Sequence, residues 1–132
     1  MKAKELAMIK RIESKSNLDI KQSDYEYNRF DAYNDISIFE VKHRHTFYED
    51  VMIEFDKFSY NHAYAMVNNL NFIYAVEMND IIYIFDIINL VKEGFNFNWN
   101  WREMPKTTEF NIKEKVQKYV GFINIKHSYC EI

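Results

Sequence analysis

Hydrophobic and polar residues alternate along residues 28–44, NRFDAYNDISIFEVKHR, in a pattern that predicts two strands joined by a tight turn. The polar pair Asn34-Asp35 separates two apolar-rich runs, which is typical of a β-hairpin. In the second run one face holds Ile36, Ile38, Glu40 and Lys42, and the other holds Ser37, Phe39 and Val41. Because both faces are largely apolar, we expect this strand to be buried at the centre of a sheet.

Helical and strand patterns alternate through the chain on both sides of this hairpin. Apolar residues at spacings of three and four predict a first helix over residues 2–14. The same spacing predicts a second helix that begins between residues 49 and 56 and ends at Asn68-Asn69. A second hairpin is predicted over residues 71–88, with its turn at Asn79-Asp80. Residues 16–24 are polar, and we expect a connector there with room for a short strand.

The C-terminal third has a strictly alternating segment, FNFNWNW, at residues 95–101. It predicts a half-buried strand with Phe95, Phe97, Trp99 and Trp101 on one face. An exposed aromatic patch that stacks on bases is the alternative interpretation. Pro105 is expected to interrupt the pattern, and VQKYVGFINI predicts the last strand.

The predicted order of helix, hairpin, helix, hairpin and irregular strands indicates the α/β or α+β class, with a mixed central β-sheet flanked by helices. With 132 residues and neither an internal repeat nor a linker, residues 1–132 are expected to form one domain. Aromatic residues make up 17% of the chain, against two glycines and one proline, which excludes a disordered or low-complexity chain.

Composition also bounds the setting in which the protein works. No apolar run approaches the ~20 residues that cross a bilayer, so we expect no membrane span. The charged N-terminus is unlike a secretory signal, and the single cysteine, Cys130, is typical of a reducing compartment; both favour the cytoplasm. The net charge of −3 neither favours nor excludes a nucleic-acid partner. The cluster of Lys113, Lys115 and Lys118 is interpreted as scattered surface lysines.

Glu40 and Lys42 are unusual on a strand expected to be buried. A buried carboxylate and ammonium are costly unless they pair with each other or with a metal, and Asp31 is a natural third member of such a group. The structural alternative is that Glu40 and Lys42 form only an ion pair at the sheet rim while Asp31 shapes the turn. His43 and His45 fall on the opposite face from Lys42 or past the strand end, so we expect them to be solvent or packing residues. His62 is expected to be a core histidine of the second helix.

An N-terminal helix with a glutamate, a strand bearing Phe30-Asp31 and a strand bearing Glu40-Val41-Lys42 resemble the PD-(D/E)XK nuclease superfamily. The resemblance covers roughly residues 2–86, in the element order of that superfamily, and Phe30 stands where its name-giving proline would be. In size and layout the chain is similar to small phage-encoded nucleases and Holliday junction resolvases. The resemblance implies a restriction-endonuclease-like core with Glu5, or else Glu13, as the helix carboxylate.

The chemistry of phosphodiester cleavage suits these residues. It requires an activated water and a Lewis acid, and the carboxylates of Asp31 and Glu40 can meet across a tight hairpin. Hard oxygen ligands suit Mg²⁺ or Mn²⁺, and the resemblance implies the Val41 carbonyl as a further metal ligand. Lys42 faces the same side as Glu40, where it can orient the attacking water or neutralise phosphate charge.

Two functions are therefore considered. The first is a metal-dependent endonuclease that hydrolyses DNA, structure-specific in the manner of a junction resolvase, with Arg44 and Lys57 holding flanking phosphates. The second is a nuclease-like fold that only binds nucleic acid or protein. The presence of Asp31, Glu40 and Lys42 together favours the enzyme. Because junctions have two-fold symmetry, a homodimer formed through the aromatic tail is one expected arrangement.

Overall fold

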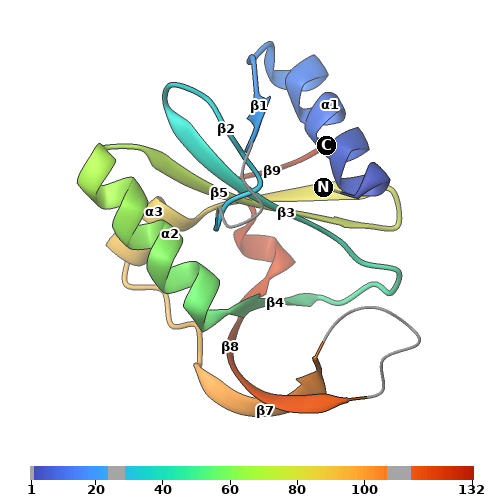
Figure 1. The fold of residues 1–132 in the computed structure, drawn as a ribbon, viewed down its shortest axis with the longest axis vertical. Coiled ribbons are helices and arrows are strands. Elements are labelled where there is room, and N and C mark those ends of the chain that lie inside the picture. The colour runs from blue at the N-terminus through green and yellow to red at the C-terminus, as the bar shows by residue number, and fades with distance from the viewer. Residues whose placement is uncertain (1, 24–28, 107–113) are drawn as a thin grey trace.

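The computed structural model describes residues 2–23, 29–106 and 114–132 (Figure 1). In chain order the elements are α1 (Ala3–Ser16), β1 (Lys21–Gln22), β2 (Ala32–Tyr33), β3 (Ser37–His43), β4 (Asp50–Glu54), α2 (Phe55–Asn68), β5 (Asn71–Met78), β6 (Ile81–Asp86), α3 (Ile87–Lys92), β7 (Asn100–Pro105), β8 (Lys115–Asn124), the 3-10 helix η1 (Ile125–His127) and β9 (Cys130–Glu131). This is an α+β fold with a mixed central sheet flanked by helices, as the sequence predicts. No helix in the described ranges is both long enough and apolar enough to cross a membrane.

The main sheet has six strands in the order β1-β2-β3-β5-β6-β9. β3 and β5 are parallel, and the other neighbouring pairs are antiparallel. Parallel neighbours need a crossover connection, and here the crossover contains β4 and α2. β3 therefore lies inside the sheet with a partner on each side, which explains why its first five residues are buried.

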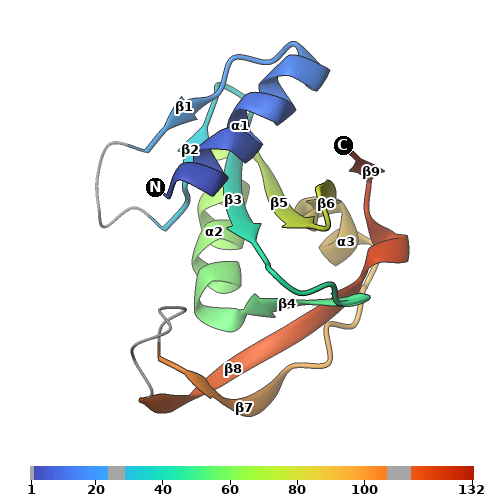
Figure 2. The same ribbon diagram turned by 90° about the vertical axis from the view of Figure 1, so that its right-hand side faces the viewer.

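Helices cover the two faces of this sheet (Figure 2). On one face α1 packs Met8, Ile9 and Ile12 against a buried cluster that includes Phe39 and Val41 of β3. On the other face α2, α3 and the second sheet enclose a larger cluster, which includes Ile38 of β3. The predicted division of β3 into two apolar faces is therefore confirmed.

Both predicted hairpins are present, and their turns have a clear chemical cause. The side-chain oxygen of Asn34 accepts the backbone N–H groups of Ile36 and Ser37 at 3.0 and 2.9 Å, which fixes the first turn. Asn79 and Asp80 both have positive φ, 51° and 63°, as a two-residue type I′ turn requires. Residue 28, where the first hairpin was predicted to begin, lies outside the described residues. The last two residues of the second predicted hairpin instead begin α3.

The second sheet, β4-β8-β7, lies below the main sheet in Figure 1 and was only partly predicted. β4 was not predicted, and residues 95–99 do not form the predicted strand, because Asn98 turns the chain with a φ of 55° and β7 starts only at residue 100. β7 ends at Pro105, as the expected interruption there predicts; the residue lies opposite Lys115 on a strand with only one neighbour. All of VQKYVGFINI except its last residue lies in β8 as predicted, and η1 and β9 follow.

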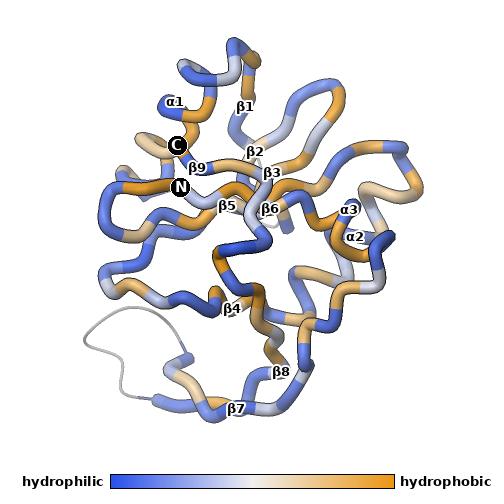
Figure 3. Tube along the Cα trace, turned by 180° about the vertical axis from the view of Figure 1, so that it is seen from behind, coloured by the Kyte–Doolittle hydropathy of each residue, from blue (hydrophilic) through white to orange (hydrophobic). Residues whose placement is uncertain are grey.

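Hydrophobic residues concentrate in the interior strands and hydrophilic residues in the turns (Figure 3). The four alternating aromatic residues of the tail do not share one environment. Phe97 is buried and Trp99 half-buried in the larger cluster, whereas Trp101 is 67% exposed. This corrects the prediction of one aromatic face, and it leaves Trp101 as the exposed member of the set.

Candidate active site

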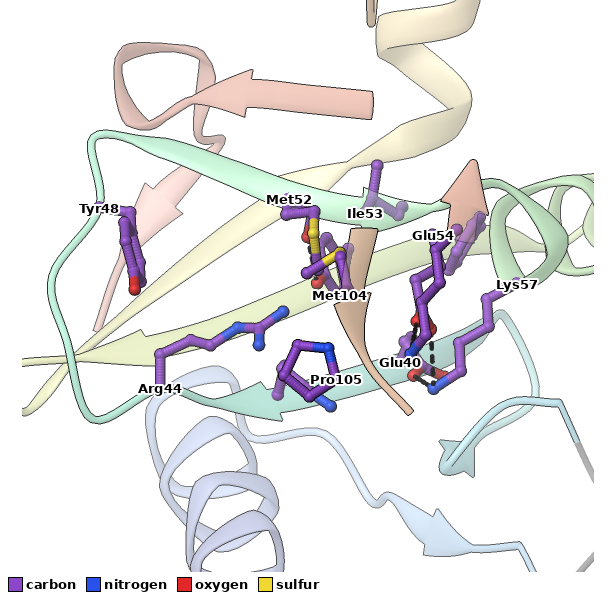
Figure 4. Close-up of a pocket in the computed structure, with 13 residues that line it drawn as sticks. Glu40, Arg44, Tyr48, Met52, Ile53, Glu54, Lys57, Met104 and Pro105 are labelled. Carbon is purple, nitrogen blue, oxygen red and sulfur yellow. Dashed lines mark hydrogen bonds and ion pairs between the residues drawn. The ribbon is translucent and has the colours of Figure 1, made fainter. Parts of the chain in front are cut away.

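Glu40 is a buried carboxylate at the middle of β3. Only 5% of the residue is exposed, because β2 and β5 flank it within the sheet and α2 passes over its face. Its Oε1 accepts a hydrogen bond from Nζ of Lys57, in the first turn of α2, at 3.3 Å (Figure 4). The strand thus places an acid where solvent cannot stabilise its charge.

Asp31 reaches the same region through an irregularity in the hairpin. Its backbone N–H donates to the Phe39 carbonyl at 2.8 Å, although the register pairs Phe39 with Ala32. Asp31 and Ala32 therefore both lie opposite Phe39, which is the pattern of a β-bulge. Bulges often change the direction of side chains beside active sites. The Asp31 carboxylate turns back onto β3 and accepts the Val41 N–H at 2.9 Å.

The chain just before Asp31 is held by α2. Asn61, fully buried, donates its side-chain amide to the Arg29 carbonyl at 3.1 Å. This role could not be predicted from the sequence, because asparagine is mostly an exposed residue. The contact links α2, which carries Lys57, to the segment that carries Asp31.

Both carboxyl groups are costly to ionise, and the charge of Asp31 adds to the cost for Glu40. Burial, and then the charge of Asp31, raise the pKa of Glu40 to about 8, although Lys57 acts in the opposite direction. Burial also raises the pKa of Asp31, with a further contribution from the charge of Glu5, while the hydrogen bond from Val41 partly offsets it. Adjacent buried acids of this kind are common at functional sites, because a cation or a shared proton relieves their repulsion.

Lys42 lines the same pocket as Glu40, as their spacing on the strand predicts. Burial lowers its pKa, and the charges of Arg44 and Lys57 lower it further. The structural alternative required an ion pair between Glu40 and Lys42. Within the described part of the chain no acid lies within 4.0 Å of the Lys42 ammonium, and Glu40 pairs with Lys57 instead.

Two residues that the sequence did not suggest, Glu54 and Lys118, extend this charge network. Glu54 ends β4, and its carboxylate lies 2.7 Å from Lys118 Nζ and 3.8 Å from Lys57 Nζ. Burial alone would raise the pKa of Glu54, but the hydrogen bond and charge of Lys118 hold it below its usual value. Burial alone would lower the pKa of Lys57, but Glu40 and Glu54 raise it.

The interpretation of the C-terminal lysines as scattered surface residues is wrong for Lys118, which is half-buried on β8 and bonded to Glu54. It holds for Lys115, which is exposed, and Lys113 lies outside the described residues. Lys118 reaches Glu54 because β8 pairs with β4, which sets Glu54 opposite Val120. This pairing could not be read from local sequence.

These side chains surround a pocket of about 280 Å³ (Figure 4). Its lining consists of Glu40, Lys42, Arg44, Tyr48, Met52, Ile53, Glu54, Lys57, Phe72, Tyr74, Met104, Pro105 and Lys118. Arg44 and Tyr48 stand at one end and Glu40 with Lys57 at the other. Asp31 is not among the lining residues; it lies beside the pocket, against Val41.

Arg44 lies close to a buried tyrosine in this pocket. Burial raises the pKa of Tyr74 to about 12, and the charge of Arg44 acts in the opposite direction. The Tyr74 hydroxyl donates to the Met52 carbonyl at 2.8 Å. Figure 4 shows the Arg44 guanidinium pointing into the pocket, where its charge suits an anion.

The donors around Asp31 are compatible with a hard divalent cation. The N–H and C=O of one residue in an antiparallel pair point to the same neighbour, so the Val41 carbonyl lies on the Asp31 side of β3. Two carboxylates and a carbonyl, completed by water, suit Mg²⁺ or Mn²⁺. No group of three His, Cys, Asp or Glu side chains with metal-site geometry occurs in residues 2–23, 29–106 and 114–132.

The two glutamates of α1 have different roles. Glu5, in the first turn, acts electrostatically on both Asp31 and Lys42 and lies at the edge of this site. Glu13 instead accepts the Ile20 backbone N–H at 3.0 Å and so fixes the segment after the helix. Of the two candidates for the helix carboxylate, the geometry favours Glu5.

The histidines lie away from the pocket. His43 Nε2 is 3.4 Å from Glu77 Oε1, on the sheet face covered by α1, and His45 follows the end of β3, as predicted. The prediction that His62 is a core histidine is only partly right, because its side chain stacks on Phe58 but the residue is half-buried.

Comparisons of this chain with protein-family models, with curated proteins and with solved structures found no match.

Proposed function

We propose that this protein is a divalent-metal-dependent endonuclease that hydrolyses phosphodiester bonds in DNA. The observation that carries the proposal is the buried Glu40 with Asp31 beside it, next to a pocket that also holds four cationic side chains. Those side chains are Lys42, Arg44, Lys57 and Lys118. The two carboxylates suit a hard metal cation, and the positively charged side chains around them suit the phosphates of a nucleic acid.

We assign metal binding and transition-state stabilisation to different residues of this site. Asp31, Glu40 and the Val41 carbonyl would hold Mg²⁺ or Mn²⁺, which when bound supplies a Lewis acid and lowers the pKa of water. Lys42 stands two residues along the strand, about 7 Å from Glu40. Because its pKa is lowered, it can take a proton from the attacking water or neutralise charge that develops on the phosphate.

The flanking cations would bind the rest of the backbone. Arg44 lies two residues beyond Lys42, just after the end of β3, and lines the same pocket. Lys57 and Lys118 lie at the Glu40 end of the pocket, each paired with Glu54. Such contacts position a nucleic acid without reading its sequence, so affinity should fall steeply with salt.

The resemblance to PD-(D/E)XK nucleases adds support. α1 carries Glu5, Asp31 directly precedes β2, and Glu40-Val41-Lys42 lies on β3, in the order that the resemblance implies. A junction-resolvase-like homodimer is the finer form of the proposal. Because Phe97 is buried and Trp99 half-buried, Trp101 is the residue of the aromatic tail that could contribute to a dimer surface.

One observation favours the second function, a fold that binds nucleic acid or protein without turnover. Lys57 lies 3.3 Å from Glu40, so the buried acid has an ion-pair partner in the absence of any metal. A structural ion pair of this kind would keep the fold intact in a protein that cleaves nothing.

Cleavage assays on linear, nicked and four-way-junction DNA, with Mg²⁺, Mn²⁺ or EDTA, separate the two functions. We expect metal-dependent cleavage by the parent protein and its loss in Glu40→Gln and Lys42→Ala. Glu131→Gln and Lys10→Ala, both at exposed positions outside the pocket, are matched controls and should cleave like the parent. Salt-sensitive DNA binding by the parent without cleavage under any metal would refute the nuclease and leave the binding module.

A further inference from the structure

Tyr48, in the loop between β3 and β4, presents an aromatic ring beside the proposed active site. It is 54% exposed and lines one end of the pocket that contains Glu40 and Lys57 at its other end (Figure 4). The aromatic residues of the tail and α2 contact one another in a packed group, but no ring–ring contact involves Tyr48 among the described residues. A large exposed ring at a pocket mouth is a surface on which a flat ligand can stack.

The loop that carries Tyr48 also borders a second cavity, of about 520 Å³, between the start of α1 and the end of β3. Lys2, Lys4, Lys42 and Arg44 contribute cations to it, against one carboxylate, that of Glu5. Lys42, Arg44 and Tyr48 line both cavities. The two cavities are therefore neighbours, and Tyr48 borders both of them. We refer to the two together as the basic path.

The dimensions of this path suit one strand better than two. At about 280 Å³ the first pocket is slightly smaller than the ~300–1,000 Å³ that small-molecule sites occupy, so it has room for no more than a single nucleotide. Met52 and Met104 add apolar surface for a base beside Tyr48 and Arg44. The acids at the other end of the pocket lie where the phosphate of the same nucleotide would bind. A positive groove with aromatic stacking is the usual way in which proteins bind single strands.

We infer that the DNA is unpaired where it is cut, and that Tyr48 stacks on the base next to the scissile phosphate while the second cavity carries the strand onward. This inference rests on the proposed nuclease function, and it names the form of its substrate. The preferred substrates are single strands, overhangs and the unpaired nucleotides of branched DNA, and intact duplex is disfavoured.

Binding can be measured without turnover. The probe is a short single-stranded oligothymidylate with one 2-aminopurine, whose fluorescence falls on stacking, in Ca²⁺ instead of Mg²⁺ or Mn²⁺; a blunt duplex of the same length is the comparison. Tyr48→Leu removes the ring and keeps apolar bulk, and Tyr48→Phe keeps the ring. Tyr129→Leu is the matched control, because Tyr129 is 78% exposed and lines neither cavity.

We expect the parent to bind the single strand more tightly than the duplex and to quench the 2-aminopurine. Tyr48→Leu should weaken single-strand binding by about 5-fold to about 150-fold, the range that corresponds to loss of one stacked base, whereas Tyr48→Phe and Tyr129→Leu should bind like the parent. Duplex binding as tight as single-strand binding, or an unchanged affinity in Tyr48→Leu, overturns the inference. Cleavage assays in Mg²⁺ report on the nuclease separately, so a protein that binds single strands through Tyr48 but never cleaves them refutes only the enzyme.

Discussion

The ammonium of Lys57 lies 3.3 Å from Oε1 of Glu40, a residue that is 5% exposed. The attraction of Lys57 is not sufficient to keep Glu40 readily ionised, because burial and Asp31 together raise its pKa to about 8. In the absence of a metal, Glu40 is therefore an acid whose charge the fold tolerates poorly. A divalent cation bound to the Glu40 carboxylate would lower the cost of ionising it.

The first prediction concerns pH. The pKa of Glu40 rises from 4.5 to about 8 on folding, so between these values the folded protein binds more protons than the unfolded chain. Its stability in EDTA should therefore be greatest at the acidic end of this window and should fall as the pH rises to about 8. Asp31 contributes with the same sign, because its pKa is also raised.

Thermal melting in EDTA across this window checks the prediction. Glu40→Gln cannot ionise, so its melting temperature should depend less on pH than that of the parent. Glu131→Gln changes an exposed glutamate on β9 and should retain the parental slope. An unchanged slope in Glu40→Gln would show that other groups cause the dependence.

The second prediction concerns metal. Mn²⁺ should raise the melting temperature of the parent, because a ligand that binds only the folded state stabilises it. In Glu40→Gln this increment should shrink, since one ligand charge is lost, while the metal-free variant should melt no lower than the parent. Calorimetric titration of Mn²⁺ into both proteins measures the affinities directly. If the metal leaves the parent unchanged and Glu40→Gln melts lower, the nuclease proposal fails.

The third prediction separates Lys42 from the metal ligands. Lys42→Ala should retain the Mn²⁺-dependent rise in melting temperature but lose turnover by about 100-fold, the scale of removing one electrostatic catalyst. Its burial lowers its pKa, so the folded state gains little from the charge and the variant should fold normally. Single-turnover cleavage beside melting with Mn²⁺ tests both parts. Loss of the metal effect in Lys42→Ala would instead indicate a structural role.

The pattern of the sequence predicted the parts of this site that lie on one hairpin. Alternation fixes which face each residue of β3 occupies, and the pair Asn34-Asp35 marks the turn, so Glu40 and Lys42 could be placed together beside Asp31. The bulge that turns Asp31 onto Val41 was not visible, because it depends on how the two strands pair and not on either strand alone.

The remaining members of the site come from strands that pair over long distances. Glu54 and Lys118 are 64 residues apart and meet because β4 pairs with β8. The short run of residues 50–54 leads directly into α2, so its apolar residues also fit the helical pattern and the strand was missed. In the tail, alternation wrongly suggested one continuous strand, since Asn98 adopts positive φ.

The last prediction uses Lys57 to decide between the two functions. Lys57→Met keeps the apolar stem and removes the ammonium, which leaves Glu40 without its ion-pair partner. In EDTA near pH 8 the variant should melt below the parent, because loss of the ammonium raises the pKa of Glu40 further, so the folded state holds protonated a carboxyl that the unfolded chain ionises. Lys118→Met is the matched control: it removes the ion pair with Glu54 and leaves the contact between Lys57 and Glu40 in place.

The effect of Mn²⁺ on these two variants then distinguishes a metal site from a structural ion pair. If Asp31 and Glu40 bind a cation, Mn²⁺ should restore much of the stability lost in Lys57→Met, because the metal compensates the same carboxylate. Mn²⁺ should restore less stability in Lys118→Met, because the carboxylate that loses its ion pair there is Glu54, which is not a proposed metal ligand. If the protein is a binding module in which Glu40 only forms an ion pair with Lys57, the opposite result is expected. Lys57→Met then stays destabilised at every Mn²⁺ concentration, which would show that Glu40 has a structural role and binds no metal.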